Sequence, residues 1–274
     1  MRPDPEVEEL EVRLILEAIH ARYGYDLREY ARPSMRRRML SALSRSEAAN
    51  LGDLQHRLLA DPGLFGVVLD QLMVQVSEMF RDPSFFLVFR REIVPLLRTY
   101  PLIKIWHAGC ASGEEVYTSA ILLAEEGLYD RTQIYATDLS GPALERAQEG
   151  VYSADLARRF AENYRAAGGT SSLDNYLSSA YDRIAIRESL RRNIVFFQHN
   201  LVSDQPPGEM QVIFCRNVLI YFGGELRQRV VTKMAGGLCR GGFLCLGHSE
   251  QPPVTLDGVV FREHVAPERI YRKG

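Results

Sequence analysis

The first 75 residues carry apolar side chains at the three- and four-residue spacing of amphipathic helices, separated by short polar connections. The pattern predicts four helices, of which the second begins at Pro33 and the third follows Asn50, a residue type that caps helices. Helices this short are unstable alone in water, so we expect them to form a small helical domain over residues 1–75. The positions that define them are Val7, Leu10, Leu14 and Ala18; Met35, Met39, Ala42 and Leu43; Leu51, Leu54, Leu58 and Leu59; and the segment 64–72.

From residue 103 the pattern changes to apolar runs of strand length that alternate with helical segments. Such runs are typical of parallel strands covered by helices on both faces. Strands are expected at 103–108, 133–137, 194–198, 212–215 and 243–246, with helices at 114–126, 142–148 and 225–238. The predicted fold class is α/β, with a small all-α domain followed by a doubly wound, Rossmann-like domain over residues 76–274.

One interval, about 152–192, departs from this alternation. A polar helix at 154–167 is followed by Gly168 and Gly169 and by a short stretch at 181–186 in which apolar and polar residues alternate. This alternation is typical of an antiparallel strand with one solvated face. We expect an insertion before the next strand that contains a small antiparallel hairpin.

Composition narrows the classes of function. The net charge of −2 argues against a nucleic-acid binder with a generally basic surface. No apolar stretch approaches the ~20 residues of a membrane span, and the N-terminus is acidic, so we expect a cytoplasmic protein without direct membrane insertion. The four cysteines lack CxxC spacing and the six histidines are scattered, so we expect reduced thiols and assign no metal site.

Local charge is more informative than net charge. Six arginines lie between residues 27 and 45 against one acid, whereas residues 4–17 carry six acids against one arginine. The apolar face of the second helix leaves at least two of Arg36, Arg37 and Arg38 facing solvent. An exposed basic cluster suggests an acidic partner, and a merely solvated helix face is the alternative.

The first strand of the second domain ends in a turn with the sequence GCASGEE, residues 109–115, immediately before a helix. Gly109 and Gly113 would let a ligand approach the backbone, and Glu114 would repel a pyrophosphate but attract an ammonium group. Asp138 ends the second strand, where an acid commonly binds ribose hydroxyls; capping the following helix is the alternative role. These residues indicate a nucleoside cofactor without identifying it. S-adenosylmethionine, which has no phosphate, would suit the acidic turn.

Longer segments resemble the CheR-type chemoreceptor methyltransferases, which are protein-glutamate O-methyltransferases. The matches occur in family order along nearly the whole chain, and the third is specific over nine residues. They are VSEMFRD at 76–82, GCASGEE at 109–115, FCRNVLIYF at 214–222, and Gly241-Gly242 followed by LGHSE at 246–250. Departures from the family pattern are Gln75, Ser77 and Met79 in the linker and Gln211 at the start of a strand; the serine retains a hydroxyl.

The resemblance implies a class I methyltransferase domain with a small inserted β-subdomain in the interval 152–192. This domain would transfer a methyl group from S-adenosylmethionine to glutamate carboxylates, leaving S-adenosylhomocysteine. The implied substrate is the acidic helical methylation region of a chemotaxis receptor or related sensory protein, which the basic cluster would attract. The implied cofactor-binding residues are Gln75, Ser77, Arg81, Gly109, Gly113, Glu114, Asp138, Asn200, Leu201, Cys215 and Arg216, and the implied catalytic residues are Arg81, Arg216 and Tyr221.

The resemblance also implies how these residues are used. Glu114 would contact the methionine amino group and Asp138 the ribose, with Asn200 and Leu201 near the adenine. Tyr221 would lie near the transferred methyl group, while the two arginines hold carboxylates of cofactor or substrate.

Two other classes of function compete with this interpretation. A nucleotide-binding oxidoreductase should show a GxGxxG turn, which this chain lacks. A non-catalytic S-adenosylmethionine-binding signalling or scaffold protein would keep the pocket and lose the transfer step. The linker departures, Gln75 above all, are its support.

Overall fold

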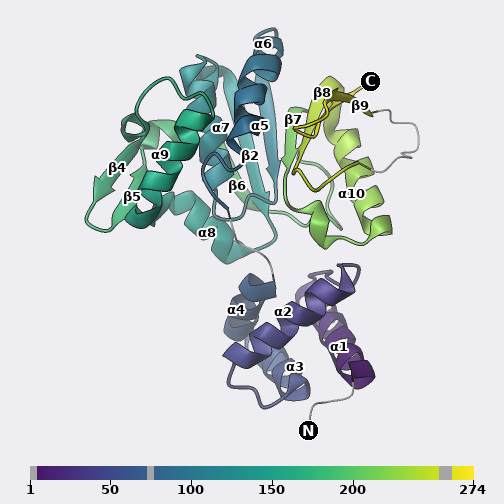
Figure 1. The fold of residues 1–274 in the computed structure, drawn as a ribbon. Coiled ribbons are helices and arrows are strands. Elements are labelled where there is room, and N and C mark those ends of the chain that lie inside the picture. Colours follow the sequence, from purple (N-terminus) through teal and green to yellow (C-terminus); the bar gives the residue numbers. More distant parts are fainter. Residues whose placement is uncertain (1–4, 73–76, 253–260) are drawn as a thin grey trace.

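The computed structural model describes residues 5–72, 77–252 and 261–274. Figure 1 shows a helical domain at one end of an α/β domain. The helical domain consists of α1 (Pro5–Tyr23), α2 (Arg32–Arg45), α3 (Leu51–Ala60) and α4 (Pro62–Leu72). The side chain of Asn50 accepts a hydrogen bond from the amide of Asp53 and caps α3, as expected. The predicted helices are therefore confirmed.

The buried face of α1 differs from the face that the apolar spacing suggested. Val7, Leu10 and Leu14 are 44–49% exposed, whereas Ile15 and Ile19 are buried. The helix carries apolar residues on two sides, but only one side can pack against the core of the domain. The side with the larger continuous stripe, which also includes Val12 and Leu16, packs into it.

The α/β domain is built on a seven-stranded sheet in the order β6-β2-β1-β7-β8-β10-β9. β1 pairs in parallel with β2 and β7, and the pairs β2–β6 and β7–β8 are also parallel. These are the predicted strands. Two further strands, β9 and β10, run antiparallel at one edge, where their charged residues gave no apolar run. The bounds are β1 Ile103–Ala108, β2 Thr132–Asp138, β6 Ile194–Gln198, β7 Met210–Cys215, β8 Leu238–Leu246, β9 Phe261–Val265 and β10 Ile270–Lys273.

Helices cover both faces of the sheet, and successive strand residues point to opposite faces. Ile105 belongs to the core beneath α5 and α7, whereas Trp106 belongs to the core shared with α10 and the helical domain. Trp106 is 1% exposed and donates to the hydroxyl of Thr137, so it is a core residue, as expected. The helices are α5 Pro83–Val88, a π-helical turn at Phe89–Ile93, α6 Val94–Leu97, α7 Glu114–Glu125, α8 Gly141–Glu149 and α10 Gly224–Gly237.

The inserted subdomain is a three-stranded antiparallel sheet rather than a single hairpin. Its order is β3-β5-β4, with β3 Val151–Ser153, β4 Leu177–Ala180 and β5 Arg183–Ile186. Tyr181, expected within a strand, is fully exposed at the turn between β4 and β5. Helix α9 (Ala157–Ala166) precedes these two strands, and its Tyr164 hydroxyl bonds to Glu125 of α7. Short 3₁₀ turns lie at Tyr129–Arg131, Ala154–Leu156, Leu173–Asn175, Glu188–Leu190 and Leu219–Tyr221.

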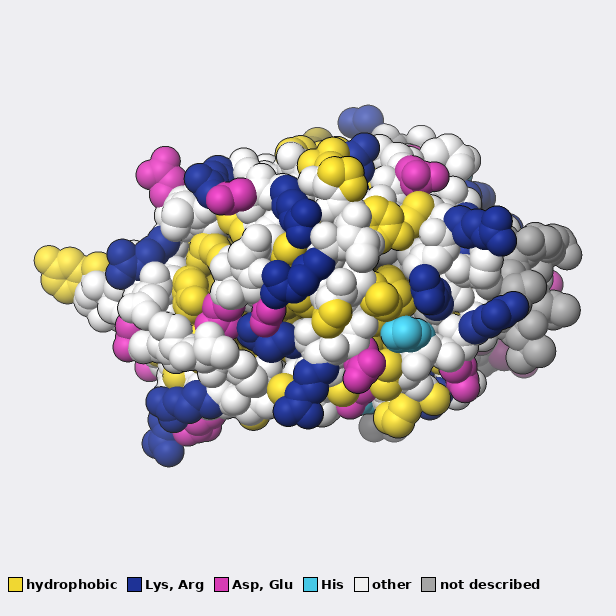
Figure 2. All heavy atoms as spheres, turned by 90° about the horizontal axis from the view of Figure 1, so that it is seen from above, with side chains coloured by type: hydrophobic (Ala, Val, Ile, Leu, Met, Phe, Trp, Pro, Cys, Tyr) yellow, Lys and Arg dark blue, Asp and Glu magenta, His cyan; other side chains and the backbone are white. Residues whose placement is uncertain are grey.

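One face of the molecule is mainly polar. The face turned away from the helical domain carries basic and acidic side chains among small, separate hydrophobic areas (Figure 2). Among the described helices, none combines the length and apolar character needed to cross a membrane. All four cysteines are buried and free, which agrees with the expectation of reduced thiols.

Candidate cofactor and active site

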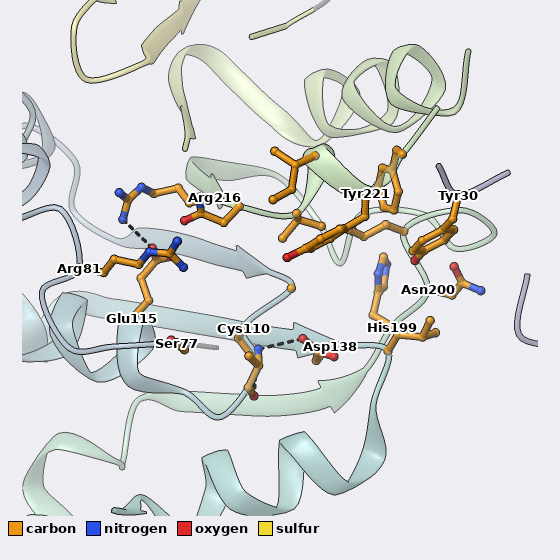
Figure 3. A pocket seen from close by; sticks show the side chains of 18 of the residues that line it. Tyr30, Ser77, Arg81, Cys110, Glu115, Asp138, His199, Asn200, Arg216 and Tyr221 are labelled. Carbon is orange, nitrogen blue, oxygen red and sulfur yellow. Dashed lines mark hydrogen bonds and ion pairs between the residues drawn. The ribbon is translucent and has the colours of Figure 1, made fainter. Parts of the chain in front are cut away.

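A cavity lies at the carboxyl ends of β1, β2 and β7, on the side of the helical domain (Figure 3). Ligands bind at this edge of doubly wound sheets because the loops there converge. We call it the central cavity. It is lined by Tyr30, Ser77, Glu78, Arg81, Gly109, Cys110, Ala111, Glu115, Asp138, Leu139, His199, Asn200, Leu201, Arg216, Asn217, Val218, Ile220, Tyr221 and Phe222.

The central cavity brings together most of the residues that the sequence singled out. Ser77, Arg81, Gly109, Asp138, Asn200, Leu201, Arg216 and Tyr221 all line it. Among the described residues, Gly113, Glu114 and Cys215 do not contribute to the lining, and Cys215 is fully buried in the core behind it. Gln75 lies outside the described residues.

The glycines of the turn serve packing more than ligand approach. Gly109 has a φ of +83°, and a Cβ there would lie 2.6 Å from a methyl group of Val218. A Cβ on Gly113, whose φ is +90°, would lie 2.9 Å from the Cβ of Ala147 in α8. These close approaches let α7 start against α8 and let the segment after β7 close over the turn.

Asp138 braces the same turn. Its Oδ2 accepts a hydrogen bond from the amide of Ala111 at 2.8 Å, and its Oδ1 accepts one from the amide of Ser140 at 3.0 Å. The helix cap of α8 is Ser140, whose hydroxyl accepts from the amide of Ala143, so the capping alternative for Asp138 is wrong. Each carboxylate oxygen can accept more than one hydrogen bond, which leaves capacity for ribose hydroxyls.

Of the two adjacent acids, Glu115 rather than Glu114 faces the cavity. Glu114 is 5% exposed, accepts from the hydroxyl of Ser112 and has its pKa raised by burial. Burial alone would also raise the pKa of Glu115, but the neighbouring Arg216 and His107 together hold that pKa below its usual value. The ionised form is therefore favoured at Glu115 and disfavoured at Glu114. Spacing could not decide between two consecutive residues at a helix start.

Arg216 occupies the centre of an ionic network. Its side chain is 1% exposed, and its two Nη atoms lie 2.8 Å from Glu115 and 2.7 Å from Asp82 of the linker. The guanidinium also stacks 4.1 Å from the ring centroid of Phe85. We expected this arginine to hold a carboxylate of the cofactor or substrate. In the structure two protein carboxylates pair with it, while it also lines the cavity.

Tyr221 is supported by the helical domain. The guanidinium of Arg38 lies 4.3 Å from the centroid of the Tyr221 ring, and its Nη1 donates to the carbonyl of Leu72 at 2.5 Å. Arg38 is only 8% exposed, and this burial lowers its pKa. Arg38 therefore belongs to the inside of the molecule and not to an exposed basic cluster.

The other two arginines of the predicted cluster do reach solvent. Arg37 is exposed, whereas Arg36 is half-exposed and donates to Glu8 of α1 at 2.6 Å. The expectation of at least two solvent-facing arginines is confirmed. The unpaired charge available to a partner is nevertheless smaller than the sequence suggested, because the acidic α1 neutralises Arg36.

A second carboxylate fixes the segment that carries Arg216 and Tyr221. Glu250, which is 2% exposed, accepts hydrogen bonds from the amides of Gly247 at 2.6 Å, Asn217 at 2.8 Å and Ile220 at 3.2 Å. Asn217 has a φ of +60°, and a Cβ on Gly247 would lie 2.8 Å from the Glu250 carboxylate. Sequence reasoning missed Glu250 as a site residue. The sequence signal that could have indicated Glu250 is its place in the LGHSE motif. The structure explains two residues of this motif: Glu250 accepts backbone hydrogen bonds, and Gly247 leaves room for its carboxylate.

Comparison with known proteins agrees with this geometry. Residues 10–73 match the family model described as CheR methyltransferase, all-alpha domain, and residues 75–261 match the one described as CheR methyltransferase, SAM binding domain. The chain belongs to the CheR methyltransferase family. The predicted family, fold class and cofactor, S-adenosylmethionine, are thereby confirmed. The roles of single residues remain predictions.

Relatives of this CheR-family chain span nearly its whole length. Methyltransferase Cher3 of Pseudomonas putida is 47% identical over 265 residues, which cover 97% of each chain. A chemotaxis protein methyltransferase of Listeria innocua is 31% identical over 83% of this chain and 85% of that protein. One of Borreliella burgdorferi is 28% identical over 94% of this chain and 92% of that protein.

The ionic network around Arg216 makes stability depend on pH. Because the folded pKa of Glu115 lies below its unfolded value, its ionised form stabilises the fold at neutral pH. That contribution is lost as pH falls from about 4.3 through the lowered folded pKa. We expect Glu115→Gln to lower the free energy of unfolding by about 1.5–3 kcal/mol at pH 7, and by less near pH 3.5.

Urea unfolding at the two pH values measures this difference. Glu162→Gln, which removes an exposed partner of Arg158, is the control and should cost less than about 1 kcal/mol. An equal loss for Glu115→Gln at both pH values would contradict a role for its charge.

Asp138 generates a prediction about cofactor affinity. Asp138→Ala should weaken S-adenosylmethionine binding by about 1.5–3 kcal/mol, the range for one charged hydrogen bond, while the protein stays folded. Calorimetric titration measures the affinity, and thermal unfolding checks the fold. Ser140→Ala, which removes the cap of α8, should leave the affinity unchanged. Wild-type affinity in a folded Asp138→Ala variant would remove Asp138 from the cofactor site.

Proposed function

We propose that this protein transfers the methyl group of S-adenosylmethionine to glutamate side-chain carboxylates of a partner protein, giving glutamate methyl esters. The proposed partner is a methyl-accepting chemotaxis receptor or a related sensory protein. The names of the Listeria and Borreliella relatives support a place in chemotaxis. The observation that carries the proposal is that Tyr221 and Arg81 line the same cavity as Asp138 and Asn200.

A carboxylate substrate suits this cavity because it needs no general base. The unperturbed pKa of a glutamate side chain is about 4.3, so the nucleophile is already ionised at neutral pH. The task that remains for the protein is to position the reactants and to exclude water. Positioning of this kind can contribute ~7–11 kcal/mol to lowering a barrier.

The lining residues fit S-adenosylmethionine along its length. Asp138 would accept the ribose hydroxyls, with Asn200 and Leu201 beside the adenine. Glu115, which lines the cavity and whose ionised form is favoured, would attract the methionine ammonium group, a role first expected of Glu114. The cofactor supplies an electrophilic methyl group on a sulfonium centre.

Tyr221 and Arg81 would position the substrate carboxylate. In Figure 3 the Tyr221 side chain reaches into the cavity between Arg81 and Asn200. Its hydroxyl would donate to the glutamate carboxylate and orient one oxygen for attack. Arg81, which also lines the cavity, would hold a carboxylate of the substrate or the cofactor. A drier site favours the reaction, since carboxylate and sulfonium charges cancel as the methyl moves.

A transfer assay tests the proposal. Incubation with radiolabelled S-adenosylmethionine and a receptor cytoplasmic fragment should place label on the fragment that base treatment releases as methanol. A non-catalytic binding protein would bind the cofactor and leave the fragment unlabelled, and a different acceptor chemistry would give base-stable label.

Tyr221→Phe is the matched variant for this assay because it keeps the ring on which Arg38 packs. Loss of the hydroxyl should lower turnover by roughly tenfold or more and change cofactor affinity by less than about twofold, as expected for a group that acts in the transition state. Single-turnover rates and calorimetry give the two quantities. Full turnover in this variant would remove Tyr221 from the mechanism.

The partner surface yields a separate prediction. We propose that Arg37, the exposed arginine of the cluster, helps attract the acidic methylation helices, with a smaller share from the paired Arg36. Arg37→Glu should lower kcat/KM for a receptor fragment by roughly twofold to fivefold at low salt, with cofactor affinity unchanged. The wild-type rate should also fall as salt rises.

The matched control carries the same charge change elsewhere. Arg240 is exposed in β8, and Arg240→Glu should leave kcat/KM at the wild-type value. Equal kcat/KM for Arg37→Glu and wild type at low salt would make Arg37 part of a solvated helix face only.

A further inference from the structure

Among the described residues of the helical domain, Tyr30, which lies between α1 and α2, lines the central cavity. Its side chain is only 7% exposed. Figure 3 shows Tyr30 at the end of the cavity where Asn200 and His199 lie, away from Ser77 and Arg81. This is the end to which the nucleoside half of the cofactor is assigned above. Within residues 1–75, sequence reasoning assigned cofactor binding to Gln75 and not to Tyr30.

The position of Tyr30 is fixed by direct pairing with the active-site segment. The amide of Ala31 donates to the carbonyl of Tyr221 at 2.8 Å, and the amide of Gly223 donates to the carbonyl of Glu29 at 3.2 Å. We call residues 29–31 and 221–223 the domain bridge. Within it the rings of Tyr30 and Phe222 meet edge to face, with centroids 4.9 Å apart. Tyr30 is thus held opposite Phe222, the residue that follows Tyr221.

The surroundings of Tyr30 suit a nucleoside. Leu139, Leu201 and Phe222 line the cavity with it, so its ring completes an apolar wall. Burial, with a smaller effect from the charge of Asp138, raises the pKa of the Tyr30 phenol far above its usual value. The hydroxyl therefore stays protonated at any physiological pH, and it can donate a hydrogen bond near the carboxylate proposed to hold the ribose.

We infer that Tyr30 is a cofactor-binding residue supplied by the helical domain, with its ring covering the nucleoside half of S-adenosylmethionine. The inference rests on the placement of Asp138 and Asn200 under the proposed function. It assigns to the helical domain a wall of the cofactor site, in addition to any role in meeting the partner protein.

This arrangement couples cofactor binding to docking of the helical domain. The domain bridge holds Tyr30 against the cavity, so a bound cofactor stabilises the bridge and an open bridge weakens cofactor binding by the same factor. The alternative is that Tyr30 only fills space between the domains. The two interpretations differ in two measurable effects. Only the first predicts that substitution of Tyr30 weakens cofactor binding and that bound cofactor slows opening of the domain bridge.

Calorimetric titration with S-adenosylhomocysteine tests the first point. Tyr30→Ala should raise Kd at least tenfold, and Tyr30→Phe, which keeps the ring, by about twofold to fivefold. The matched control is Tyr25→Phe, because the Tyr25 hydroxyl bonds Gln198 across the domain boundary without lining the cavity. Its Kd should stay within twofold of wild type. Wild-type Kd in Tyr30→Ala would overturn the inference.

Hydrogen exchange on the wild-type protein tests the second point and does not depend on any variant folding. Saturating S-adenosylhomocysteine should slow exchange of the Ala31 amide, which bonds to Tyr221. Unchanged exchange at Ala31 with bound cofactor would also overturn the inference. Failure of the wild-type protein to bind S-adenosylhomocysteine is a distinct result, which would refute the cofactor site itself.

Discussion

The Arg216 guanidinium lies almost wholly buried between Asp82 of the linker and Glu115 of α7. A buried charge that loses a partner is strongly destabilising, so the three segments that meet there must keep their places. The linker carries Ser77 and Arg81, α7 begins at the cofactor turn, and the chain beyond Arg216 carries Tyr221. One buried cation therefore sets the shape of the cavity before any ligand enters, which is the preorganisation that a positioning enzyme requires.

The helical domain is more closely involved in the site than its separate fold suggests. Its core and the core on one face of the sheet form a single hydrophobic cluster that includes Leu27, Leu219 and Leu226. Arg38 supports the ring of Tyr221, and the domain bridge joins both domains beside the cavity. The site is composite, assembled from segments nearly two hundred residues apart.

The sequence predicted what depends on local patterns and failed where tertiary contacts decide. The parallel strands were found because burial on both faces gives continuous apolar runs, whereas β9 and β10, at the sheet edge, lack that signal. The apolar face of α2 predicted that at least two of Arg36, Arg37 and Arg38 face solvent, but not which one is buried. Arg38 is the buried one, because an aromatic ring and a carbonyl compensate its charge. Which of Glu114 and Glu115 faces the cavity depends on how α7 is rotated against β1, and the local sequence does not determine that rotation.

Three residues pack directly against one another although about thirty residues of chain separate the first from the other two: Asn217, in the left-handed conformation, Gly247, which has no side chain, and Glu250, whose carboxylate contacts both. A side chain at position 247 would overlap the Glu250 carboxylate, and loss of that carboxylate would leave the amides of Gly247, Asn217 and Ile220 without this acceptor. The three positions consequently depend on one another, so the residue types that one of them accepts are limited by the other two. A chimera that imports the end of β8 from a distant homologue must import the segment after β7 with it.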